Sequence, residues 1–436
     1  MKPLPFLAAL LLVPAAACTG APPAPLDIGS RRELFVDRFL IESLSGVELR
    51  LHEPQLAPPM AEPADDMEYG TVIKDGDVFR LYTRAGRGAR FDGDTSEVTR
   101  YCESRDGIHW TRPQLGLHEI DGSRDNNVIL HERSVCHNFS PFLDTRPGVP
   151  ADERFKALAG VLYRNPGGGL VAFASGDGIH WRKLQDAPVM TKGAFDSQNV
   201  SFWSEAEKKY VAYVRTFTAG VSTATEWRLD GLRSVSRATS DDFLHWTDPV
   251  PLNPNLPGEH IYTTLTHPYF RAPHIYIALP TRFHPDRGSS TDILFMTARG
   301  DGPFDRTFRE AFIRPGLDPA RWGNRSNYAA LNVVPTGPAE MSIYATPFRR
   351  FTLRTDGFAS AHAAADPGEL RTRPLVFAGN ELSLNVSTTA GGSVRLEIQD
   401  AAGAPLPGFS LADCSPIVGD SIDRVGPGSV RSRPGR

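Results

Sequence analysis

Three carboxylates stand at equivalent positions in three similar segments of the chain. Asp66 begins DMEYGTVI, Asp196 begins DSQNVSFW and Glu259 begins EHIYTTLT, and in each segment a turn follows eight residues after the acid. Asp65 and Glu68 lie close to Asp66 and compete with it for this position. Carboxylates that meet in one small volume are suited to general acid–base and nucleophilic chemistry. The spacing therefore predicts a shared acidic site if the three segments are equivalent parts of one fold.

Four other segments each end in an arginine. They are LYTR, VLYR, AYVR and LPTR, whose last residues are Arg84, Arg164, Arg215 and Arg282. If these segments run antiparallel to the acidic ones, their ends lie at the same edge of the fold as the carboxylates. Guanidinium groups at that edge could pair with the acids and tune their pKa, or could bind an anionic group bidentately. A ring of purely structural ion pairs is the alternative.

A short motif returns along the chain and indicates the fold. SRDGIHW (Ser104–Trp110) is repeated as SGDGIHW (Ser175–Trp181) and SDDFLHW (Ser240–Trp246), and weaker copies surround Asp301 and Asp356. Each copy follows an alternating segment and leads into another, which is typical of a β-hairpin turn. The spacing of the copies fits one four-stranded sheet for each copy. We therefore predict an all-β fold whose main domain is a five-bladed β-propeller.

In a propeller the first strand of each blade lines the central channel, so residues at its entrance meet at the axis. This geometry would bring Asp66, Asp196 and Glu259 together. Polar and aromatic residues at the same rim, together with the four arginines, are candidates for binding a substrate. These rim residues are His137, Asn138, Gln198, Asn199, His260, Tyr262, Asn324, Arg325, Asn327 and Tyr328.

Local motifs resemble a known clan of enzymes. FDSQNVSFWSEAEKKYVAYV (Phe195–Val214) resembles the RDPKVFW block and following hairpin of glycoside hydrolase family 32, the invertase and levanase family. YGTVIKDGDVFRLYTR (Tyr69–Arg84) resembles the strand pair after this family's first catalytic aspartate, and GEHIYTTL stands where its acidic glutamate begins a strand. Family 43, which contains arabinanases and xylosidases, belongs to the same five-bladed propeller clan. The family 32 NDPNG motif is absent, and its Asp-Pro and Glu-Cys pairs are Asp196-Ser197 and Glu259-His260 here.

The resemblance implies an exported glycoside hydrolase that cleaves a poly- or oligosaccharide with a pair of carboxylates. It assigns Asp66 as the nucleophile or general base, Asp196 as a transition-state stabiliser and Glu259 as the general acid. The arginines point toward an anionic glycan that carries uronate or sulfate groups. Two alternatives stay open: a glycan-binding propeller without turnover, and a sialidase-like enzyme with Tyr262 as its nucleophile.

The N-terminus has the pattern of a bacterial targeting segment. Lys2 precedes an apolar run, Phe6–Val13, and small residues then lead to Cys18. This pattern predicts a signal peptide over residues 1–18, with lipidation at Cys18 favoured and plain secretion as the alternative. We expect a periplasmic or outer-membrane-anchored protein whose only link to a membrane is the lipid at Cys18. Residues 19–29 are rich in proline and are predicted to form a linker.

We expect the propeller to span residues 30–366, with Ser30–Glu53 supplying the outer strand that closes the ring. Residues 367–425 alternate strand-forming runs with Gly turns, which is typical of the β-sandwich that follows the propeller in family 32. Only part of such a sandwich fits before residues 426–436, which are basic, rich in Gly and Pro, and predicted to be disordered. A truncated or frame-shifted C-terminus would explain the partial sandwich.

The net charge, the cysteines and the histidines limit which partners and cofactors can be expected. A net charge of −4 over 436 residues gives no support for a nucleic-acid partner. The cysteines and histidines do not have the spacing of a metal site, so neither a metal nor another cofactor is predicted. The histidines of the three repeated turns are expected to be structural. Apart from Cys18 three cysteines remain, so at least one thiol is unpaired.

Overall fold

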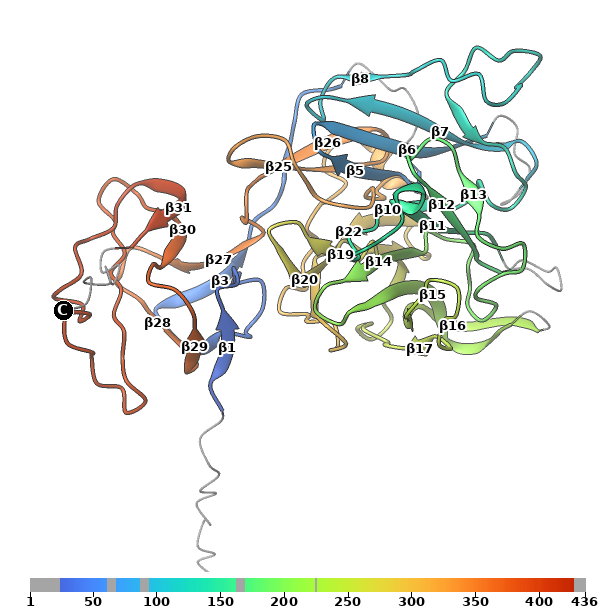
Figure 1. Cartoon of the computed structure of the whole chain (residues 1–436). Coiled ribbons are helices and arrows are strands. Elements are labelled where there is room, and N and C mark those ends of the chain that lie inside the picture. The colour runs from blue at the N-terminus through green and yellow to red at the C-terminus, as the bar shows by residue number, and fades with distance from the viewer. Residues whose placement is uncertain (1–23, 61–67, 87–93, 162–168, 224–225, 427–436) are drawn as a thin grey trace, which may run out of the picture.

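The computed structural model describes residues 24–60, 68–86, 94–161, 169–223 and 226–426. These residues form 31 strands and two short 3-10 helices, η1 (Ala151–Glu153) and η2 (Pro319–Trp322). The prediction of an all-β protein is confirmed. Figure 1 shows a larger lobe and, beside it, a smaller lobe that contains the C-terminal strands. No helix in the described part of the chain is long and apolar enough to cross a membrane.

The larger lobe is built around five short strands, each of which begins a sheet. They are β5 (Thr71–Asp75), β10 (Ser140–Leu143), β14 (Val200–Ser204), β19 (His267–Tyr269) and β24 (Val334–Pro335). β5 contacts β10 and β24, and β14 contacts β10 and β19. The Val333 amide donates a hydrogen bond to His267 Nε2 (3.1 Å), which links the fourth strand to the fifth. First strands arranged around a common axis are the defining feature of a β-propeller.

In the first three blades the strands follow one another outward in chain order. The first blade is β5, β6 (Val78–Gly86), β7 (Glu97–Ser104) and β8 (Trp110–Thr111), with β9 (Val128–Leu130) also paired to β7. The second is β10, β11 (Phe155–Ala159), β12 (Val171–Ser175) and β13 (Arg182–Lys183). The third is β14, β15 (Lys209–Ser222), β16 (Trp227–Ser240) and β17 (Val250–Pro251). Neighbouring strands are antiparallel, so first strands begin and second strands end at the same edge.

The next region consists of two three-stranded sheets. One contains β18 (His260–Thr263), β21 (Thr281–His284) and β22 (Ser290–Ile293). The other contains β19, β20 (Ala272–Ala278) and β23 (Met296–Arg299). Because β18 leads into β19, β20 into β21 and β22 into β23, the two sheets are successive halves of three interrupted strands. The strand pairing alone therefore does not fix the number of blades.

A strand from the N-terminal part of the chain completes the last sheet. This sheet contains β24, β25 (Glu340–Ala345), β26 (Arg349–Arg354) and β4 (Gln55–Leu56). The predicted segment, Ser30–Glu53, ends just before β4 and forms other pairs: β2 (Ile41–Ser45) with β28 (Glu369–Thr372), and β3 (Val47–Leu51) with β27 (Ala359–Ala363). The prediction of the closing strand was therefore wrong by a few residues, because alternation marks a strand but not its partner.

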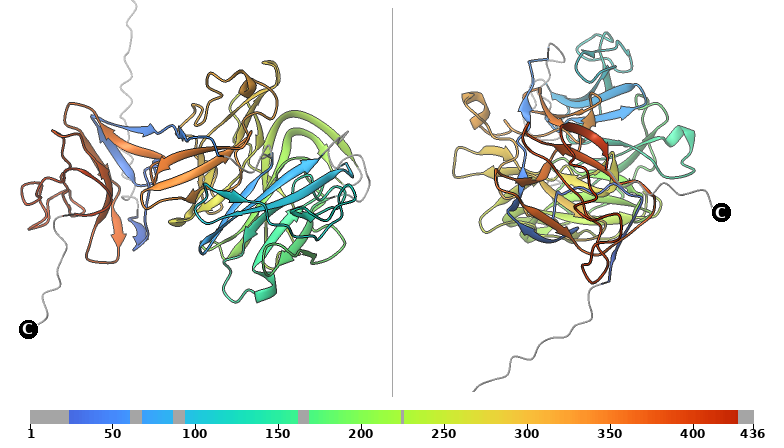
Figure 2. Two further views of the ribbon diagram at one scale, coloured as in Figure 1. Left: turned by 90° about the horizontal axis from the view of Figure 1, so that it is seen from above. Right: turned by 90° about the vertical axis from the view of Figure 1, so that its left-hand side faces the viewer.

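The smaller lobe draws strands from both ends of the described chain. Besides the two pairs just named, β1 (Leu26–Gly29) runs parallel to β29 (Leu375–Phe377), and β30 (Ser383–Ser387) pairs with β31 (Asp420–Val425). Figure 2 shows these N-terminal strands within the smaller lobe. The lobe thus uses part of the predicted linker, part of the predicted propeller and the predicted partial sandwich. Leu26–Gly29, at the end of the predicted linker, is a strand.

Several predictions fall outside the described residues. They concern the signal peptide, lipidation at Cys18 and the disordered tail, which belong to residues 1–23 and 427–436. Within the described residues no disulfide joins Cys102, Cys136 and Cys414, and all three are buried.

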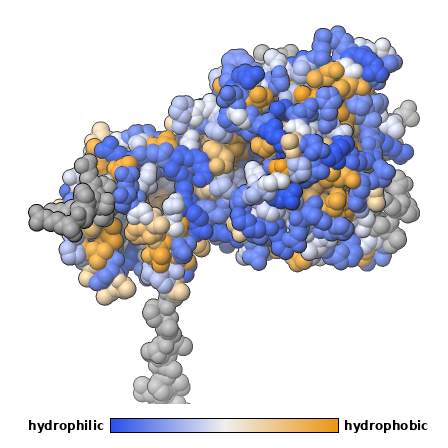
Figure 3. Space-filling view, viewed as in Figure 1, coloured by the Kyte–Doolittle hydropathy of each residue, from blue (hydrophilic) through white to orange (hydrophobic). Residues whose placement is uncertain are grey.

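The apolar core lies between neighbouring blades. One cluster joins blade one to blade two and includes Ile73 and Phe173, and another joins blade one to the last blade and includes Phe79 and Tyr344. Figure 3 shows a mainly hydrophilic surface on which hydrophobic residues are scattered over both lobes. The inner strands are therefore held in place by side chains of adjacent blades, which fixes the axial residues described below.

The three complete copies of the repeated motif form the same turn. One carboxylate oxygen of Asp177 accepts hydrogen bonds from the Ile179 and His180 amides (both 2.8 Å), and the other lies 2.7 Å from His180 Nδ1. Burial opposes the charge, but these hydrogen bonds hold the pKa of Asp177 well below its usual range. The turns of Asp106 and Asp242 contain the same bonds.

Two of these turns receive a tyrosine from the adjacent blade. Tyr82 Oη donates to the Gly178 carbonyl (2.9 Å), and Tyr344 Oη donates to the Gly107 carbonyl (2.5 Å). A Cβ atom on Gly178 would lie 2.6 Å from Tyr82 Oη, and this residue has a φ of 78°. Glycine is needed here both for the left-handed backbone and for the close approach of the tyrosine. The repeated turns thus connect blades at the edge where third strands end.

Candidate functional site

Three tyrosines from distant parts of the chain lie one beside another near the axis, in what we call the tyrosine stack. Tyr69 immediately precedes the first blade, Tyr328 precedes the last one, and Tyr262 lies on β18. The ring centroids of Tyr69 and Tyr328 are 5.9 Å apart with an interplanar angle of 18°, and those of Tyr262 and Tyr328 are 5.6 Å apart at 36°. Burial raises the pKa of Tyr69 and Tyr328 well above the usual value, so both phenols stay neutral.

At the Tyr69 end of this stack lies a carboxylate of the first blade, Glu68. Arg84 Nη2 lies 2.5 Å from Glu68 Oε2, and Arg325 Nε lies 3.1 Å from Glu68 Oε1. The Arg84 guanidinium also lies over the Tyr69 ring, 5.2 Å from its centroid. Asp66, the predicted base, and its competitor Asp65 lie outside the described residues. Of the blade-one acids considered from the sequence, Glu68 is the one described at the axis.

At the Tyr262 end lies Asp196, which forms an ion pair with Arg215. Arg215 is fixed in turn, because its Nε donates to the Ala194 carbonyl (3.1 Å) and its guanidinium lies 5.0 Å from the Tyr262 centroid. The Arg215 side chain is 3% exposed, whereas that of Asp196 is 16% exposed. A second arginine, Arg233, covers Tyr262 at 5.1 Å. The sequence prediction thus located an acid, an arginine and an aromatic residue that do meet.

We name this group the axial cluster. It consists of Glu68, Tyr69, Arg84, Asp196, Arg215, Arg233, Tyr262, Arg325 and Tyr328.

The loop that carries Asp196 is shaped by two buried asparagines. Asn138 Nδ2 donates to the Phe195 and Ser197 carbonyls (2.5 and 3.0 Å), and Asn199 Nδ2 donates to the same two carbonyls (3.0 and 2.7 Å). Both asparagines are essentially unexposed. They were predicted to bind substrate, but their amide groups are used to hold the Asp196 loop. They therefore position the acid.

Gln198 and His137 also lie deep beneath the rim. Gln198 Nε2 donates to the Gly70 carbonyl (3.1 Å), which ties the third blade to the first. His137 Nδ1 lies within hydrogen-bonding distance of both Arg84 Nη1 (2.9 Å) and Glu97 Oε1 (3.1 Å), and its ring meets Tyr69 edge-on. His137 is fully buried. Both residues therefore help to hold the axial cluster in place through hydrogen bonds to its neighbours.

Glu259, the predicted general acid, is also paired with arginine. Arg306 donates to both of its oxygens (2.8 and 3.1 Å), and its Oε2 accepts the Leu256 amide (3.1 Å). Burial acts to raise the pKa of Glu259, but the hydrogen bonds from Arg306 and Leu256 bring it below the usual value. A general acid needs the opposite shift. In this arrangement the Glu259 carboxylate is favoured in its charged form, and its role as proton donor stays a prediction.

The other predicted rim residues have different environments: two are engaged by neighbouring groups, one is exposed and one lies outside the described residues. Arg282 pairs bidentately with Asp292 (2.9 and 2.7 Å). Asn327 is buried, and its Nδ2 donates to the Thr291 carbonyl (2.8 Å), so it also has a positioning role. Asn324 is exposed. Arg164 lies outside the described residues.

Sequence reasoning missed several residues that complete the site. The missed residues are Tyr69, Glu97, Arg233 and Arg306. Arg233 lies within the third strand of its blade, and neither overlay of the sequence included third strands. Glu97 begins β7 and meets His137 across 40 positions of sequence, a separation that leaves no local pattern.

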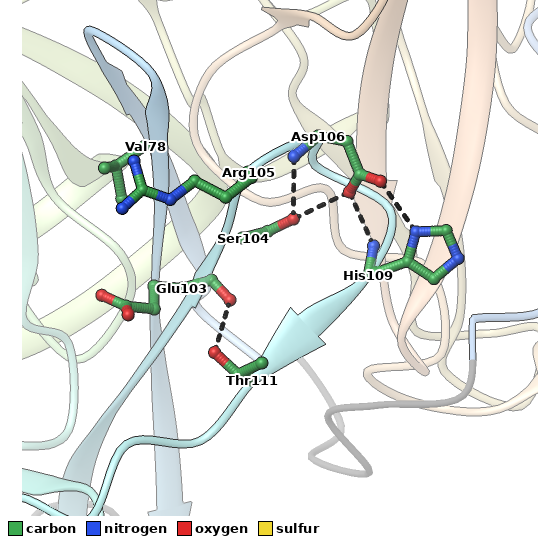
Figure 4. Close-up of a pocket in the computed structure, with 7 residues that line it drawn as sticks. All are labelled: Val78, Glu103, Ser104, Arg105, Asp106, His109 and Thr111. Atoms are coloured by element: carbon green, nitrogen blue, oxygen red, sulfur yellow. Dashed lines mark hydrogen bonds and ion pairs between the residues drawn. The ribbon is translucent and has the colours of Figure 1, made fainter.

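A surface hollow lies elsewhere, at the first repeated turn. Figure 4 shows Asp106 in this hollow, bonded to Ser104 and His109 of its own turn, with Arg105 and Glu103 beside it. The Asp106 carboxylate is already satisfied by the turn amides and by His109, and Glu103 Oε2 accepts a hydrogen bond from the Tyr101 hydroxyl (3.1 Å), so this hollow does not bring two free carboxylates together. The axial cluster is the stronger candidate for the functional site.

Comparisons with known proteins gave structural matches only. No family model matches the chain, and no curated protein matches it. Among solved structures the chain is similar to one described as a glycoside hydrolase, with 14% identity, a TM-score of 0.47, and coverage of 69% of this chain and 92% of the other. It is also similar to an N-acetylgalactosamine deacetylase from F. plautii in complex with blood group B trisaccharide, with 13% identity, a TM-score of 0.46, and coverage of 69% and 86%. A further match is a thermostable family-43 glycoside hydrolase, with 12% identity, a TM-score of 0.42, and coverage of 73% and 97%. At these values the likeness does not extend to function.

Proposed function

We propose that the protein is an exported glycoside hydrolase that cleaves a poly- or oligosaccharide at the axial cluster. One observation carries this proposal. Two carboxylates from different blades, Glu68 and Asp196, stand at opposite ends of one tyrosine stack, each paired with arginine. Hydrolysis of a glycosidic bond requires two carboxyl groups beside the sugar.

The two carboxylates suit different roles. Glu68 faces two guanidinium groups, Arg84 and Arg325, which fits a charged nucleophile, base or transition-state stabiliser better than a proton donor. Asp196 is paired through Oδ1 with one guanidinium, and its side chain is partly exposed, so Oδ2 can reach a sugar oxygen. Asp66 remains the sequence-based candidate for the base, next to Glu68 in the chain.

The aromatic and cationic groups give the site a means to bind sugar. Tyr262 is partly exposed and offers a ring face and a hydroxyl at the rim. Apolar and aromatic walls with a few fixed polar groups are typical of small-molecule sites. The arginines favour a glycan that carries carboxylate or sulfate groups.

A binding protein without turnover is the second candidate. It is favoured by the engagement of Glu259 with Arg306, which leaves the axial cluster without its predicted proton donor. A protein of this kind would keep the rings and arginines for binding and would lack the acid.

The proposal is tested by a reducing-sugar screen of the chain from Thr19 onward against neutral and acidic polysaccharides. Asp196→Asn and Glu68→Gln are compared with the wild type, and Asp186→Asn, which removes an exposed acid, serves as the control. We expect each axial variant to lose about 10²- to 10⁴-fold in turnover while the control stays near wild type. Binding of a glycan by all four proteins with no turnover by any of them would instead establish the binding protein.

A further inference from the structure

Arg233 has its backbone fixed on both sides. It lies on β16 opposite Phe217 of β15. Its amide donates to His260 Nδ1 (3.1 Å), and its carbonyl accepts a hydrogen bond from Asn255 Nδ2 (2.7 Å). The base of the side chain is therefore held rigidly, and its direction is set by the fold.

The Arg233 side chain extends between aromatic rings. Its guanidinium lies 4.8 Å from the Phe283 centroid, 5.1 Å from that of Tyr262 and 5.6 Å from that of Phe217. Its Nε is buried without a hydrogen-bond partner, and within the described part of the chain no carboxylate forms an ion pair with it. Rings can orient a guanidinium and partly offset its charge, but they do not accept its N–H hydrogen bonds.

A second guanidinium nearby adds to the excess of positive charge around Arg233. Arg215 lies over two of the same rings, Phe217 and Tyr262, and its ion-pair partner is Asp196. Burial and the nearby charge of Arg215 both lower the pKa of Arg233 from its usual value. Of these two arginines, only Arg215 has a carboxylate partner among the described residues. Arg233 is half-buried, so its charge is only partly hydrated, and an anion bound there would offset the lost hydration.

We propose that Arg233 is a specificity-determining residue that binds an anionic substituent of the sugar, a carboxylate or a sulfate, at the Tyr262 end of the axial cluster. This inference rests on the proposed function, because it names the class of glycan that the same site takes. The guanidinium offers a planar set of N–H donors that matches either group bidentately. Tyr262 then lies beside the ring of the sugar that carries the charge.

The test uses matched pairs of glycans with the chain from Thr19 onward. A galacturonate oligosaccharide is paired with its carboxyl-reduced neutral form, and a sulfated galactan oligosaccharide is paired with its desulfated form. Turnover and calorimetric affinity are measured for the wild type, Arg233→Gln and Arg233→Lys. Arg182→Gln is the control, because Arg182 is an exposed arginine of the second blade paired with Asp152 and Glu153.

We expect Arg233→Gln to weaken binding of one acidic glycan by about 10- to 100-fold and to leave its neutral counterpart within about twofold. Arg233→Lys should recover only part of the affinity, because lysine keeps the charge but not the planar fork. The control should bind like the wild type. Whichever acidic glycan shows the effect distinguishes a carboxylate from a sulfate.

Two other results would overturn the inference and are distinguishable from each other. If the wild type acts on neutral glycans and Arg233→Gln leaves every glycan unchanged, the hydrolase stands and the role of Arg233 is wrong. If no protein binds or cleaves any glycan, the proposed function itself fails. Thermal melting shows whether Arg233→Gln is folded, and if it is not, the acidic-to-neutral preference of Arg233→Lys decides.

Discussion

Asp177, in the turn after a third strand, and Asp196, in the loop before a first strand, illustrate two ways to hold a carboxylate. Asp177 is bound by the amides of Ile179 and His180, which are its near neighbours in the chain. Asp196 is paired with Arg215 on the returning strand and lies near Tyr262 from another sheet. The first arrangement forms within one turn, whereas the second needs Arg215 from the next strand of the same sheet and a contact with Tyr262 that forms only when the sheets are assembled.

This difference distinguishes carboxylates that only stabilise the fold from carboxylates that are available to a ligand. A carboxylate satisfied by its own turn has no capacity left for a ligand, and its motif can be repeated three times without functional meaning. Asp196, in contrast, is partly exposed and lies beside Arg215 and Tyr262, so it can meet a substrate. Glu259 resembles Asp177 more than Asp196 in this respect, because Arg306 and the Leu256 amide together satisfy it.

The largest expected effect separates Asp196 from Glu259. Asp196→Asn should lower the turnover of the folded protein by at least about 10²-fold, and it should also destabilise the protein because the buried Arg215 loses its charged partner. Glu259→Gln should leave turnover of the folded protein near wild type but destabilise it by about 2 to 3 kcal/mol, because Arg306 loses its charged partner. Turnover and thermal unfolding of both variants provide the check. Loss of turnover in folded Glu259→Gln would restore the sequence-based assignment of Glu259 as the acid.

Gly178→Ala should show how strongly a repeated turn depends on the adjacent blade. The new Cβ would lie 2.6 Å from Tyr82 Oη, so we expect a loss of about 2 to 4 kcal/mol in the free energy of unfolding. Gly76→Ala is the matched control, since Gly76 also has a positive φ but nothing lies within 4 Å of its Cβ position. Gly76→Ala should lower the free energy of unfolding by about 1 kcal/mol. Equal losses in urea titrations of the two variants would show that the contact with Tyr82 is unimportant.

The buried His267, at the junction of two inner strands, should make the free energy of unfolding depend on pH. Burial lowers the pKa of His267 to about 4, while its Nδ1 donates to the Leu265 carbonyl and its Nε2 accepts the Val333 amide. The unfolded chain takes up this proton below about pH 6.5, so the contribution of His267 is present above that pH and falls toward pH 4. We expect a loss of about 1 to 2 kcal/mol between pH 7.5 and pH 5.

Urea midpoints at the two pH values measure this effect. His267→Gln should be less stable at pH 7.5 but should show a flatter pH dependence. An unchanged slope in His267→Gln would contradict the assignment.

The smallest effect is expected for a single turn carboxylate. Asp177→Asn should cost about 1 kcal/mol, since the amide keeps one acceptor for the backbone but loses the charge that pairs with His180. The pKa of Asp177 is lowered in the fold, so this stability is present above about pH 4 and is lost as the pH falls further. Chemical unfolding at pH 7 and pH 3 should show the difference narrowing at low pH. A constant difference would rule out the charge as its source.

Much of the fold followed from short-range patterns. The turn of Ser175–Trp181 could be predicted because Asp177 and Gly178 determine it through neighbouring amides and a left-handed backbone. Alternation in Phe195–Val214 predicted a hairpin, and β14 and β15 form it. The overlay of first strands also placed Asp196 near the axis correctly, because strand length and side-chain period are local properties.

The sequence by itself determined the strands, the repeated turns and the presence of acids and arginines near strand ends. Only the tertiary structure decided that Glu68 lies at the axis, that Arg306 engages Glu259, and that Arg233 shares Tyr262 with Arg215. It also decided that β2 and β3 pair within the smaller lobe. The physical reason is the same in each case. A strand's period and a turn's hydrogen bonds arise between near neighbours, whereas ion pairs and strand partners depend on which distant segments the packed blades bring together.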